Sequence, residues 1–448
     1  MKKVLILGAG MVVKPIVTHL LNKGYMVTVA TRTKSKADAI IAGHPNGNSV
    51  EWTVDREQEL DRLIQQHDLT VSLLPYIHHL MVARKCIHFK RDMLTTSYVK
   101  PEMRALDEEA RKAGIIILNE LGLDPGIDHM SAMRIIDHIH SKEGKVDEFY
   151  SFCGALVAPE VEENPFRYKF TWAPKGVVMA GNNDGKYLLN GNVRYIPTED
   201  LFKNPLQVAF PGVGLLEVYP NRDSLPYAEL YGIPEVKTIF RGTFRYQGWC
   251  GILDAMKRLG LLSYEKMNLE GLTYAGFLAR QTGETDLDQL RNKIASRLDT
   301  AVDSLPVRAL EWLGLFSDEP VNRREDSPFE IISDLMIAKM MIQPDERDMV
   351  VMLHTFVASY PDGKQEVIKS RMLDFGTLRT ATSVARTVAL PAACGVEMIL
   401  EGRIRAKGVH IPVVPEIYKP ILDSLEKMNI RMEEEYGLPL TERIRMNG

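Results

Sequence analysis

Apolar and polar positions follow two rhythms over the first 120 residues of the chain. Short apolar runs rich in β-branched residues predict strands at VLIL (4–7), MVTVA (26–30), VEWTV (50–54), LTVSLL (69–74), MLTTS (93–97) and IIIL (115–118). Helical stretches lie between most of them, as in Met11–Lys23, where apolar residues share one face and Gly24 is suited to end the helix. This order predicts a doubly wound parallel sheet with its ligand site at the carboxyl ends of the strands.

The pattern changes further along the chain. From about Val146 it shows longer strands and loops rich in Pro, Gly and aromatic residues, which predicts a second, mixed α/β domain. Residues 251–343 are typical of helices and predict an all-helical insert. Residues 348–376 form two alternating runs around a Pro-Asp-Gly turn, which predicts a hairpin that returns to the second sheet.

Composition and charge limit the possible functions. The 448 residues are 45% hydrophobic and 25% charged, which is typical of a globular protein of two or three domains. A formal net charge of −4 argues against general affinity for nucleic acid or an anionic membrane. Any anion that the protein binds must therefore meet a local cluster of basic residues.

Cysteine usage and apolar segments indicate the compartment. The four cysteines lie far apart, without the spacing of a zinc site or a disulfide scaffold: Cys86, Cys153, Cys250 and Cys394. The N-terminal apolar run is too short for a signal sequence and leads into a glycine turn. The longest apolar tract, residues 384–400, contains Arg386, Pro391 and Glu397, so we expect a buried helix there and a cytoplasmic protein.

The turn after the first predicted strand, GAGMVV (8–13), is typical of a dinucleotide site. Gly8 and Gly10 match the first two glycines of G-x-G-x-x-G, whereas Val13 stands at the third position. Gly8 allows a tight turn, Gly10 lets a pyrophosphate approach the backbone, and the helix N-terminus attracts the phosphates. We therefore expect cofactor contacts along this turn, at Gly8, Ala9, Gly10, Met11 and Val12.

The second predicted strand ends on Arg32, 24 residues after Gly8, where many dinucleotide folds carry an acid for the ribose hydroxyls. A guanidinium there can hold a 2′-phosphate, with Thr33 and Lys34 adding donors. The sequence therefore favours NADP over NAD. The alternative is a solvated basic turn before the next helix.

Three polar segments follow later strands: PYIHH (75–79), SYV (97–99) and NELGLDPGIDH (119–129). They should meet at one rim of the parallel sheet, although each alone could be an ordinary connecting loop. We assign no metal, because His78, His79 and His129 have no Cys or Glu partner at ligand spacing.

Together with TTSYV, NPFRYKFTW, YPNRDSLPY, RGTFRYQG and the closing GVHIPVVPEIYKPILDSLEKMNI, these segments resemble the glutamate-forming saccharopine dehydrogenases over nearly the whole chain. The resemblance implies a Rossmann-type domain (1–127 plus 385–448), a mixed α/β substrate and dimerisation domain (128–250 plus 344–384), a helical domain (251–343), and a homodimer. It also implies that glutamate condenses with α-aminoadipate semialdehyde and that NADP(H) interconverts the imine and saccharopine.

The resemblance implies specific contacts. Saccharopine carries three carboxylates, and guanidinium groups match carboxylate geometry, so Arg222, Arg241 and Arg245 are candidates to bind them. Substrate contacts are implied at Ser97, Tyr98, Asp124, Arg222, Thr243, Phe244 and Arg245. Further cofactor contacts are implied at Thr31, Arg32, Thr33, Leu74, Pro75, Tyr76, Asp124, Pro125 and Gly126. Asp124 is the first candidate for holding or deprotonating the reacting amine, and Tyr98 and Cys153 are weaker acid/base candidates.

Each role has an alternative. Asp124 could shape an Asp-Pro turn, Cys153 could be an inert buried thiol, and the neighbouring Arg241 could form a surface ion pair. Two other functions also remain open: a related imine-reducing enzyme, either lysine-forming or polyamine-forming, and a non-catalytic NADP-binding sensor. The arginines favour a polycarboxylate substrate over a polyamine.

Overall fold

The computed structural model describes residues 1–161 and 164–446. The chain divides into two compact units. The first contains Met1–Val146, the short segment Leu230–Ile233 and Met352–Glu442. The second contains Asp147–Glu229, Pro234–Val351 and the end of the chain from Arg443. The three-domain division expected from the sequence stays a prediction.

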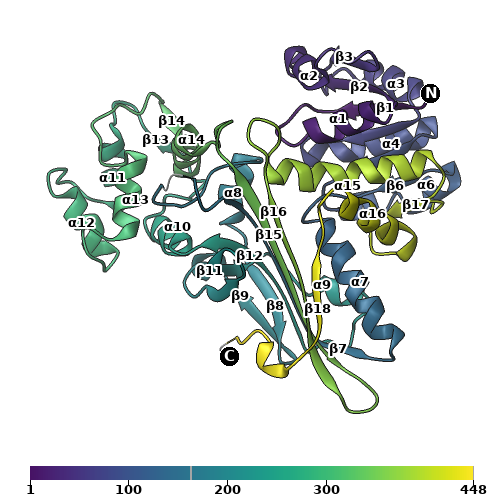
Figure 1. The fold of residues 1–448 in the computed structure, drawn as a ribbon. Coiled ribbons are helices and arrows are strands. Elements are labelled where there is room, and N and C mark those ends of the chain that lie inside the picture. The colour runs from purple at the N-terminus through teal and green to yellow at the C-terminus, as the bar shows by residue number, and fades with distance from the viewer. Residues whose placement is uncertain (162–163, 447–448) are drawn as a thin grey trace. The chain divides into compact units, whose positions relative to one another are not determined.

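The first unit contains a seven-stranded parallel sheet in the order β17-β6-β5-β4-β1-β2-β3 (Figure 1). Its strands are β1 (Lys3–Leu7), β2 (Met26–Thr31), β3 (Gly47–Glu51), β4 (Leu69–Ser72), β5 (Asp92–Thr95), β6 (Ile116–Leu118) and β17 (Gly408–His410). The prediction of a doubly wound parallel sheet is confirmed. One strand was placed wrongly, at 50–54, because β3 is a half-exposed edge strand whose Asn48 and Ser49 carry no apolar signal.

Helices cover both faces of this sheet. The helices of the first unit are α1 (Lys14–Asn22), α2 (Lys34–Ile41), α3 (Glu57–Gln66), α4 (His79–Phe89), α5 (Pro101–Arg104), α6 (Asp107–Ala113), α7 (Ile127–Ser141), α15 (Ser383–Leu400) and α16 (Pro415–Lys427), with the 3-10 turns η1 (Tyr76–His78) and η3 (Leu440–Glu442). Leu5 and Leu7 pack with apolar residues of α3, α4 and α6, while α1 packs on α15. The helix α1 starts three residues later than predicted, because Gly10–Val13 form the turn before it.

The helix α15 is long and apolar enough in composition to cross a membrane, but 78% of it is buried inside the structure. It packs on α1, α16 and β5. The prediction of a buried helix at 384–400 is therefore confirmed by its contacts.

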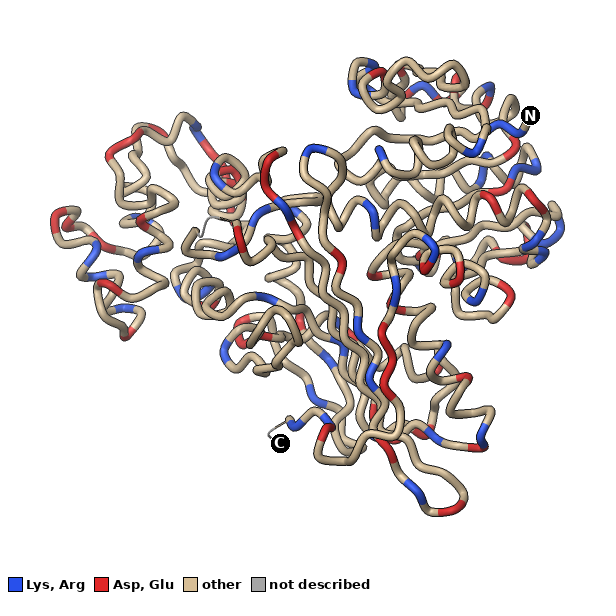
Figure 2. Tube along the Cα trace, viewed as in Figure 1, with Lys and Arg blue, Asp and Glu red and all other residues tan. Residues whose placement is uncertain are grey.

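The first unit also holds the hairpin of β15 (Asp348–Ser359, which enters this unit at Met352) and β16 (Gln365–Phe375), followed by β18 (Glu433–Leu438). The predicted Pro-Asp-Gly turn joins β15 to β16. Figure 2 shows the acidic residues of β18 beside basic residues of β16, where Lys369 faces Glu435 and Arg371 pairs with that same carboxylate.

The second unit contains a mixed sheet in which β10, β11, β12 and β7 are consecutive neighbours and β8 pairs with β12 and β9. The strands are β7 (Lys145–Val157), β8 (Gly185–Leu189), β9 (Asn192–Ile196), β10 (Leu206–Phe210), β11 (Gly214–Pro220) and β12 (Thr238–Tyr246). Shorter elements are α8 (Pro174–Ala180), η2 (Thr198–Asp200) and α9 (Pro226–Leu230).

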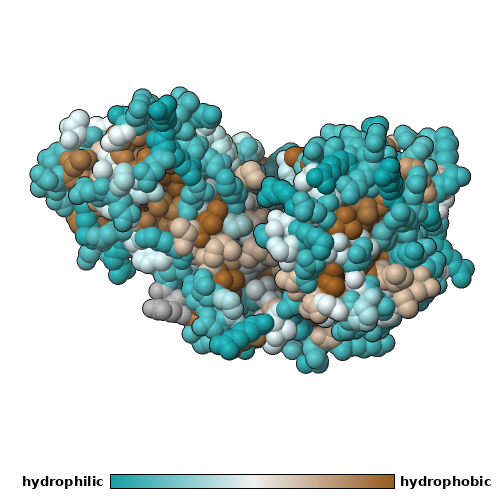
Figure 3. Space-filling view, turned by 90° about the horizontal axis from the view of Figure 1, so that it is seen from above, coloured by the Kyte–Doolittle hydropathy of each residue, from teal (hydrophilic) through white to brown (hydrophobic). Residues whose placement is uncertain are grey.

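Helices dominate the segment between β12 and β15, as predicted: α10 (Trp249–Arg258), α11 (Tyr274–Thr282), α12 (Leu290–Arg297), α13 (Leu305–Leu313) and α14 (Pro328–Met340). Turns and loops connect these helices, and the segment also contains the two-residue strands β13 (Met267–Asn268) and β14 (Glu325–Asp326), which pair with each other. The face of the protein in Figure 3 is mainly hydrophilic, in line with the globular composition.

Candidate active site

The glycine turn after β1 has the geometry that a dinucleotide requires. Gly8 has φ +111°, and a Cβ there would lie 2.9 Å from the carbonyl oxygen of Leu73, so only glycine fits. Within the described part of the chain, no atom lies within 4 Å of the Cβ position at Gly10. Val13 is 1% exposed and directly precedes α1, so it packs inward without closing this space. The turn therefore leaves its backbone open beside a helix N-terminus, which fits a pyrophosphate.

The end of β2 presents a basic side chain to solvent. Arg32 and Thr33 are exposed, and Arg32 forms no ion pair with any residue that the structure describes. Thr33 precedes α2, but its side chain does not cap that helix. Lys34, in contrast, lies 3.1 Å from Asp38 and is already paired. Arg32 and Thr33 are thus available for a 2′-phosphate, which fits NADP.

The segment after β4 lies against the same turn, because the carbonyl of Leu73 is the atom closest to the Cβ position at Gly8. Leu74 is half-buried, whereas Pro75 and Tyr76 are exposed. Tyr76 is 60% exposed, and the Lys100 ammonium lies 5.5 Å from the centre of its ring. This segment offers an apolar and aromatic surface next to the predicted pyrophosphate position.

The loop after β6 is fixed by close backbone packing. Gly126 has φ +147°, and a Cβ there would lie 2.0 Å from the carbonyl oxygen of Gly122, so no other residue fits. The amide of Gly126 donates to Asp128 Oδ1 at 2.6 Å. Pro125 is buried, and the half-buried Asp124 accepts a hydrogen bond of 2.8 Å from the Tyr98 hydroxyl. The structure thus brings together two residues that the sequence places after different strands.

A buried acid, Glu120, contacts the segment that carries Tyr98, and no pattern in the sequence singled it out. Glu120 is 4% exposed, and its Oε1 accepts a 2.8 Å hydrogen bond from the backbone amide of Val99. Its Oε2 lies 2.7 Å from Nε2 of His129, whose Nδ1 lies 2.8 Å from the Tyr231 hydroxyl. Glu120 and His129 therefore hold the segment that carries Tyr98. Their only sequence signal was the polar motif NELGLDPGIDH.

In the second unit, the side chains of the arginine-rich strand β12 alternate between the two faces of the sheet. Successive side chains of a strand point to opposite faces, so Arg241, Thr243 and Arg245 share one face. Cys153 of β7 stands opposite Thr243 in the register of the two strands. Phe244 points to the other face, where its ring centre lies 5.5 Å from that of Phe152. Of the implied substrate residues on this sheet, Phe244 alone offers no side chain to this face.

The Arg245 guanidinium lies in an aromatic cage. Arg245 is 4% exposed, and its Cζ lies 5.0 Å from the ring centre of Tyr168, 5.8 Å from Tyr219 and 5.2 Å from Trp249. Its Nη1 donates to the carbonyl oxygen of Phe244 at 2.8 Å. Among the described residues it forms no ion pair, and its Nε has no hydrogen-bond acceptor. A buried cation without a carboxylate is costly for stability, which is typical of a site that binds an anion.

The cage tyrosines respond to both burial and this charge. Burial raises the pKa of Tyr168 and Tyr219, and the neighbouring Arg245 charge acts in the opposite direction. Both hydroxyls therefore stay protonated at neutral pH. Among these residues Arg245 alone carries a formal charge, and the buried Glu217 stands opposite it in the register of β11 and β12.

The two other arginines differ from Arg245. Arg241 is 3% exposed, and its Nη1 donates to the Tyr227 hydroxyl at 2.6 Å while its Cζ lies 4.1 Å from that ring centre. The interpretation of Arg241 as a surface ion pair is therefore wrong, because the side chain is buried. Arg222 is exposed, with φ +58°, and its carbonyl accepts a 2.8 Å hydrogen bond from the Lys186 amide.

The cysteines are all free and buried. Burial raises the pKa of Cys86 and of Cys394 to about 12, so these thiols are protonated and unreactive at neutral pH. Cys153 is 8% exposed and lies on the sheet face that carries Arg245. Its position agrees with either a site residue or an inert thiol.

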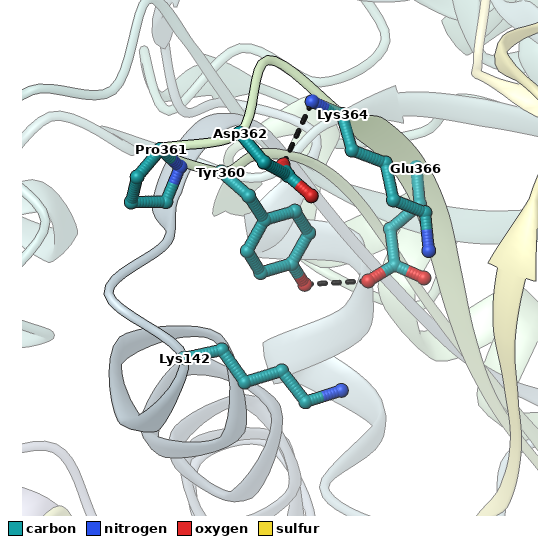
Figure 4. A pocket seen from close by; sticks show the side chains of 6 residues that line it. All are labelled: Lys142, Tyr360, Pro361, Asp362, Lys364 and Glu366. Atoms are coloured by element: carbon teal, nitrogen blue, oxygen red, sulfur yellow. Dashed lines mark hydrogen bonds between the residues drawn. The ribbon is translucent and has the colours of Figure 1, made fainter.

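A pocket of about 350 Å³ lies elsewhere in the first unit, between the turn of the β15–β16 hairpin and the end of α7 (Figure 4). It is lined by Lys142, Tyr360, Pro361, Asp362, Lys364 and Glu366, none of which is a predicted site residue. The Tyr360 hydroxyl donates to Glu366, and the two lysines are balanced by two acids. This mixed lining favours no particular ligand charge. In the described ranges 1–161 and 164–446, no group of three His, Cys, Asp or Glu residues could hold a metal ion.

Comparison with known proteins indicates a chemistry for the residues around the glycine turn and for those of strand β12. The chain is 37% identical to a Schizosaccharomyces pombe protein named saccharopine dehydrogenase [NADP(+), L-glutamate-forming], over 97% of this chain and 99% of that protein. It is also 37% identical to a mitochondrial alpha-aminoadipic semialdehyde synthase of Bos taurus, covering 96% of this chain but 47% of the bovine protein. The chain thus spans about half the length of that relative.

Solved structures give the same result. The apo saccharopine dehydrogenase (L-Glu forming) of Saccharomyces cerevisiae matches with a TM-score of 0.89 and 35% identity, over 97% of this chain and 100% of that chain. A homospermidine synthase from Legionella pneumophila, solved with NAD, matches with a TM-score of 0.58 and 10% identity, over 100% and 94% of the two chains. That second likeness concerns the fold alone.

Family models cover nearly the whole sequence. Residues 4–118 match the saccharopine dehydrogenase NADP binding domain, and residues 122–430 match the saccharopine dehydrogenase C-terminal domain. The first range contains the glycine turn, Arg32 and Tyr98, and the second contains Asp124 and Arg245. The chain therefore belongs to the saccharopine dehydrogenase family.

Proposed function

We propose that the protein is an NADP-dependent oxidoreductase that interconverts saccharopine with L-glutamate and α-aminoadipate semialdehyde through an imine. The observation that carries the proposal is Arg245, a buried guanidinium without a carboxylate partner among the described residues, in a chain of this family. A substrate with three carboxylates supplies the missing anion. Arg32 and Thr33, exposed at the end of β2, account for the choice of NADP.

The residues of the first unit bind the cofactor and hold the reacting nitrogen in this proposal. The glycine turn and Arg32 hold the pyrophosphate and the 2′-phosphate, and bound NADP(H) supplies or accepts the hydride. The Asp124 carboxylate, bonded to the Tyr98 hydroxyl at 2.8 Å, attracts the substrate nitrogen in its protonated form. Tyr98 and Asp124 also offer a route for the proton that this nitrogen must lose before it forms or leaves the imine.

The residues of the second unit select the substrate. Arg245 and Arg222 bind carboxylates, and Thr243 adds a hydroxyl on the same face as Arg245. Guanidinium groups reject a polyamine, because like charges repel. This argument favours saccharopine over the substrates of polyamine-forming relatives, to which the chain is similar in fold alone.

The test is steady-state turnover of the purified protein. With saccharopine and NADP⁺ we expect NADPH formation and equimolar glutamate, and NAD⁺ should serve poorly. Lysine as the product would indicate the lysine-forming reaction, and turnover of a polyamine would indicate the other alternative. NADP binding without turnover of any of these substrates would indicate a sensor and refute the proposal.

We further propose that the protein is a cytoplasmic homodimer and that its three domains have the boundaries expected from the sequence. Four free thiols suit a reducing compartment. Light scattering at micromolar concentration tests the dimer, and limited proteolysis near residues 250 and 343 tests the helical domain. A monomeric mass would refute the dimer.

A further inference from the structure

A buried histidine, His79, lies within hydrogen-bond distance of Ser97. His79 is the first residue of α4 and is 4% exposed. Its Nδ1 lies 2.8 Å from the hydroxyl of Ser72, at the end of β4. Its Nε2 lies 2.8 Å from the Ser97 hydroxyl and 3.3 Å from Thr95 Oγ1. Ser72 and Thr95 are fully buried, whereas Ser97 is half-buried and reaches the rim of the sheet.

The hydrogen bonds around His79 determine which ring nitrogen carries the proton. The Thr95 hydroxyl donates its proton to the carbonyl oxygen of Ser72 at 2.8 Å, so it can face His79 only as an acceptor. Nε2 must therefore carry the hydrogen, which it shares between Thr95 and Ser97. In the neutral ring Nδ1 is then an acceptor, and it receives the proton of the Ser72 hydroxyl.

The ring stays neutral under working conditions. Burial lowers the pKa of His79 to about 4, and the charge of His78 acts in the same direction. At neutral pH the ring has one donor and one acceptor, so the directions of the bonds are fixed. Ser97 accepts from Nε2, and its own proton is not used by His79.

We propose that His79 is a positioning residue that keeps the Ser97 hydroxyl proton free for donation to a carboxylate oxygen of the substrate. In the opposite tautomer the Ser97 proton would be spent on Nε2, and the hydroxyl would turn away from a ligand acceptor. The buried chain from Ser72 through His79 to Ser97 prevents this. The inference rests on the proposed function, because the role of Ser97 as a substrate contact is implied only by the resemblance to enzymes that catalyse that reaction.

Three substitutions at His79 test the direction of the bond to Ser97. In His79→Gln the amide nitrogen can take the place of Nε2 and donate to Ser97, whereas His79→Asn ends near the position of Nδ1 and cannot reach. His79→Leu removes both groups. We expect His79→Asn and His79→Leu to raise the KM for saccharopine roughly three- to tenfold, the effect of one hydrogen bond, while His79→Gln stays closer to wild type. The KM for NADP should not change in any of them.

A double-mutant cycle with Ser97→Ala separates positioning from a structural role. In the Ser97→Ala background, His79→Asn should cause no further rise in the KM for saccharopine. His67→Asn is the matched control, because His67 is another buried histidine of this unit, bonded to Leu63 O at 2.6 Å and Thr28 Oγ1 at 2.8 Å. It should lower the melting temperature without changing the KM for saccharopine.

The possible outcomes distinguish failure of the inference about His79 from failure of the proposed function. If the wild-type protein turns over saccharopine but the effects of His79→Asn and Ser97→Ala are additive, or Ser97→Ala has no effect, the inference about His79 is wrong. If the wild-type protein does not turn over saccharopine, the proposed function fails and the inference fails with it. NADP binding confirms that each variant is folded, and His79→Gln decides the question if His79→Asn does not fold.

Discussion

Arg245→Met should separate substrate binding from stability. Methionine has a similar length and no charge, so it can occupy the cage of Tyr168, Tyr219 and Trp249 without a guanidinium. If the function of Arg245 is to bind the substrate, the variant loses saccharopine binding and keeps its fold. If Arg245 is present for the fold, the variant loses stability instead.

The structure predicts a small effect on stability. The substitution removes one hydrogen bond, to Phe244 O at 2.8 Å, which contributes about 1 kcal/mol. It also removes the contacts of a cation with three rings at 5.0 to 5.8 Å, about 2 kcal/mol when buried. Against these losses, the folded variant no longer buries a charge, a cost of several kcal/mol for an ion without a partner. We expect a melting temperature equal to or above that of the wild-type protein.

The effect on substrate binding should be large. A charge-assisted hydrogen bond to a carboxylate contributes about 1.5–3 kcal/mol, and 1.4 kcal/mol is tenfold in affinity. The KM for saccharopine should therefore rise roughly ten- to hundredfold, while the KM for NADP stays near wild type. Arg245→Lys should restore little activity, because an ammonium lacks the planar fork. The assay is NADPH absorbance at varied saccharopine, with melting temperature measured on the same preparation.

Arg241→Met is the matched control, because Arg241 is buried on the same strand and the same face of β12. Its guanidinium donates to the Tyr227 hydroxyl at 2.6 Å, so the substitution disrupts a buried interaction. We expect it to lower the melting temperature, with a smaller change than Arg245→Met in the KM for saccharopine. An Arg245→Met variant with a wild-type KM, or one that unfolds like Arg241→Met, would refute the reasoning about the cage.

Three further predictions concern the first unit. Arg32→Asp should weaken NADP binding by about 2 kcal/mol and spare NAD, and equal affinity of the wild-type protein for both cofactors in titrations would contradict this. Asp124→Asn should lower kcat/KM roughly ten- to a hundredfold, or about 1.4–2.7 kcal/mol, whereas a variant that loses only melting temperature would assign Asp124 to its turn. Because burial lowers the pKa of His79 to about 4, the unfolded chain binds a proton between pH 6.5 and 4 that the folded protein does not. The free energy of unfolding should decrease as the pH is lowered from 6.5 to 4, by on the order of 3 kcal/mol from this group. Between pH 7 and pH 5, His79→Gln should lose less stability than the wild-type protein in denaturation experiments.

The sequence predicted the parallel sheet because local signals agree there. Buried strands such as VLIL (4–7) are continuously apolar, the helices between them are amphipathic, and Gly8 marks the turn between β1 and α1. The position of the edge strand β3 was predicted wrongly, because half of its surface is exposed and its polar residues are typical of a loop. Apolar periodicity detects burial, so it fails where a strand is only half buried.

The candidate cofactor residues could be predicted further than the candidate substrate residues. Chain order alone places Gly8, Arg32 and Tyr76 at the carboxyl ends of neighbouring parallel strands, so the topology brings them together. Hydrogen bonds across the fold have no such signal. The bond from Tyr98 to Asp124 joins residues 26 positions apart, and that from His129 to Tyr231 joins residues 102 positions apart.

The segment RGTFR illustrates what decides between a structural and a functional arginine. Arg241 and Arg245 lie four residues apart on one strand, so they share a face and both become buried when β12 enters the sheet. The sequence gives no basis for distinguishing the two arginines, because strand periodicity predicts burial but not hydrogen-bond or ion-pair partners. In the structure the Arg241 guanidinium donates to the Tyr227 hydroxyl, whereas the Arg245 guanidinium donates to the carbonyl oxygen of Phe244 and lies among three aromatic rings. A charge that the fold buries and leaves without an ion pair lowers stability, and natural sequences retain such conflicts mainly at functional sites. The aromatic surroundings of Arg245 and its lack of an ion pair among the described residues are therefore the reason that we propose it as the contact for an anionic substrate.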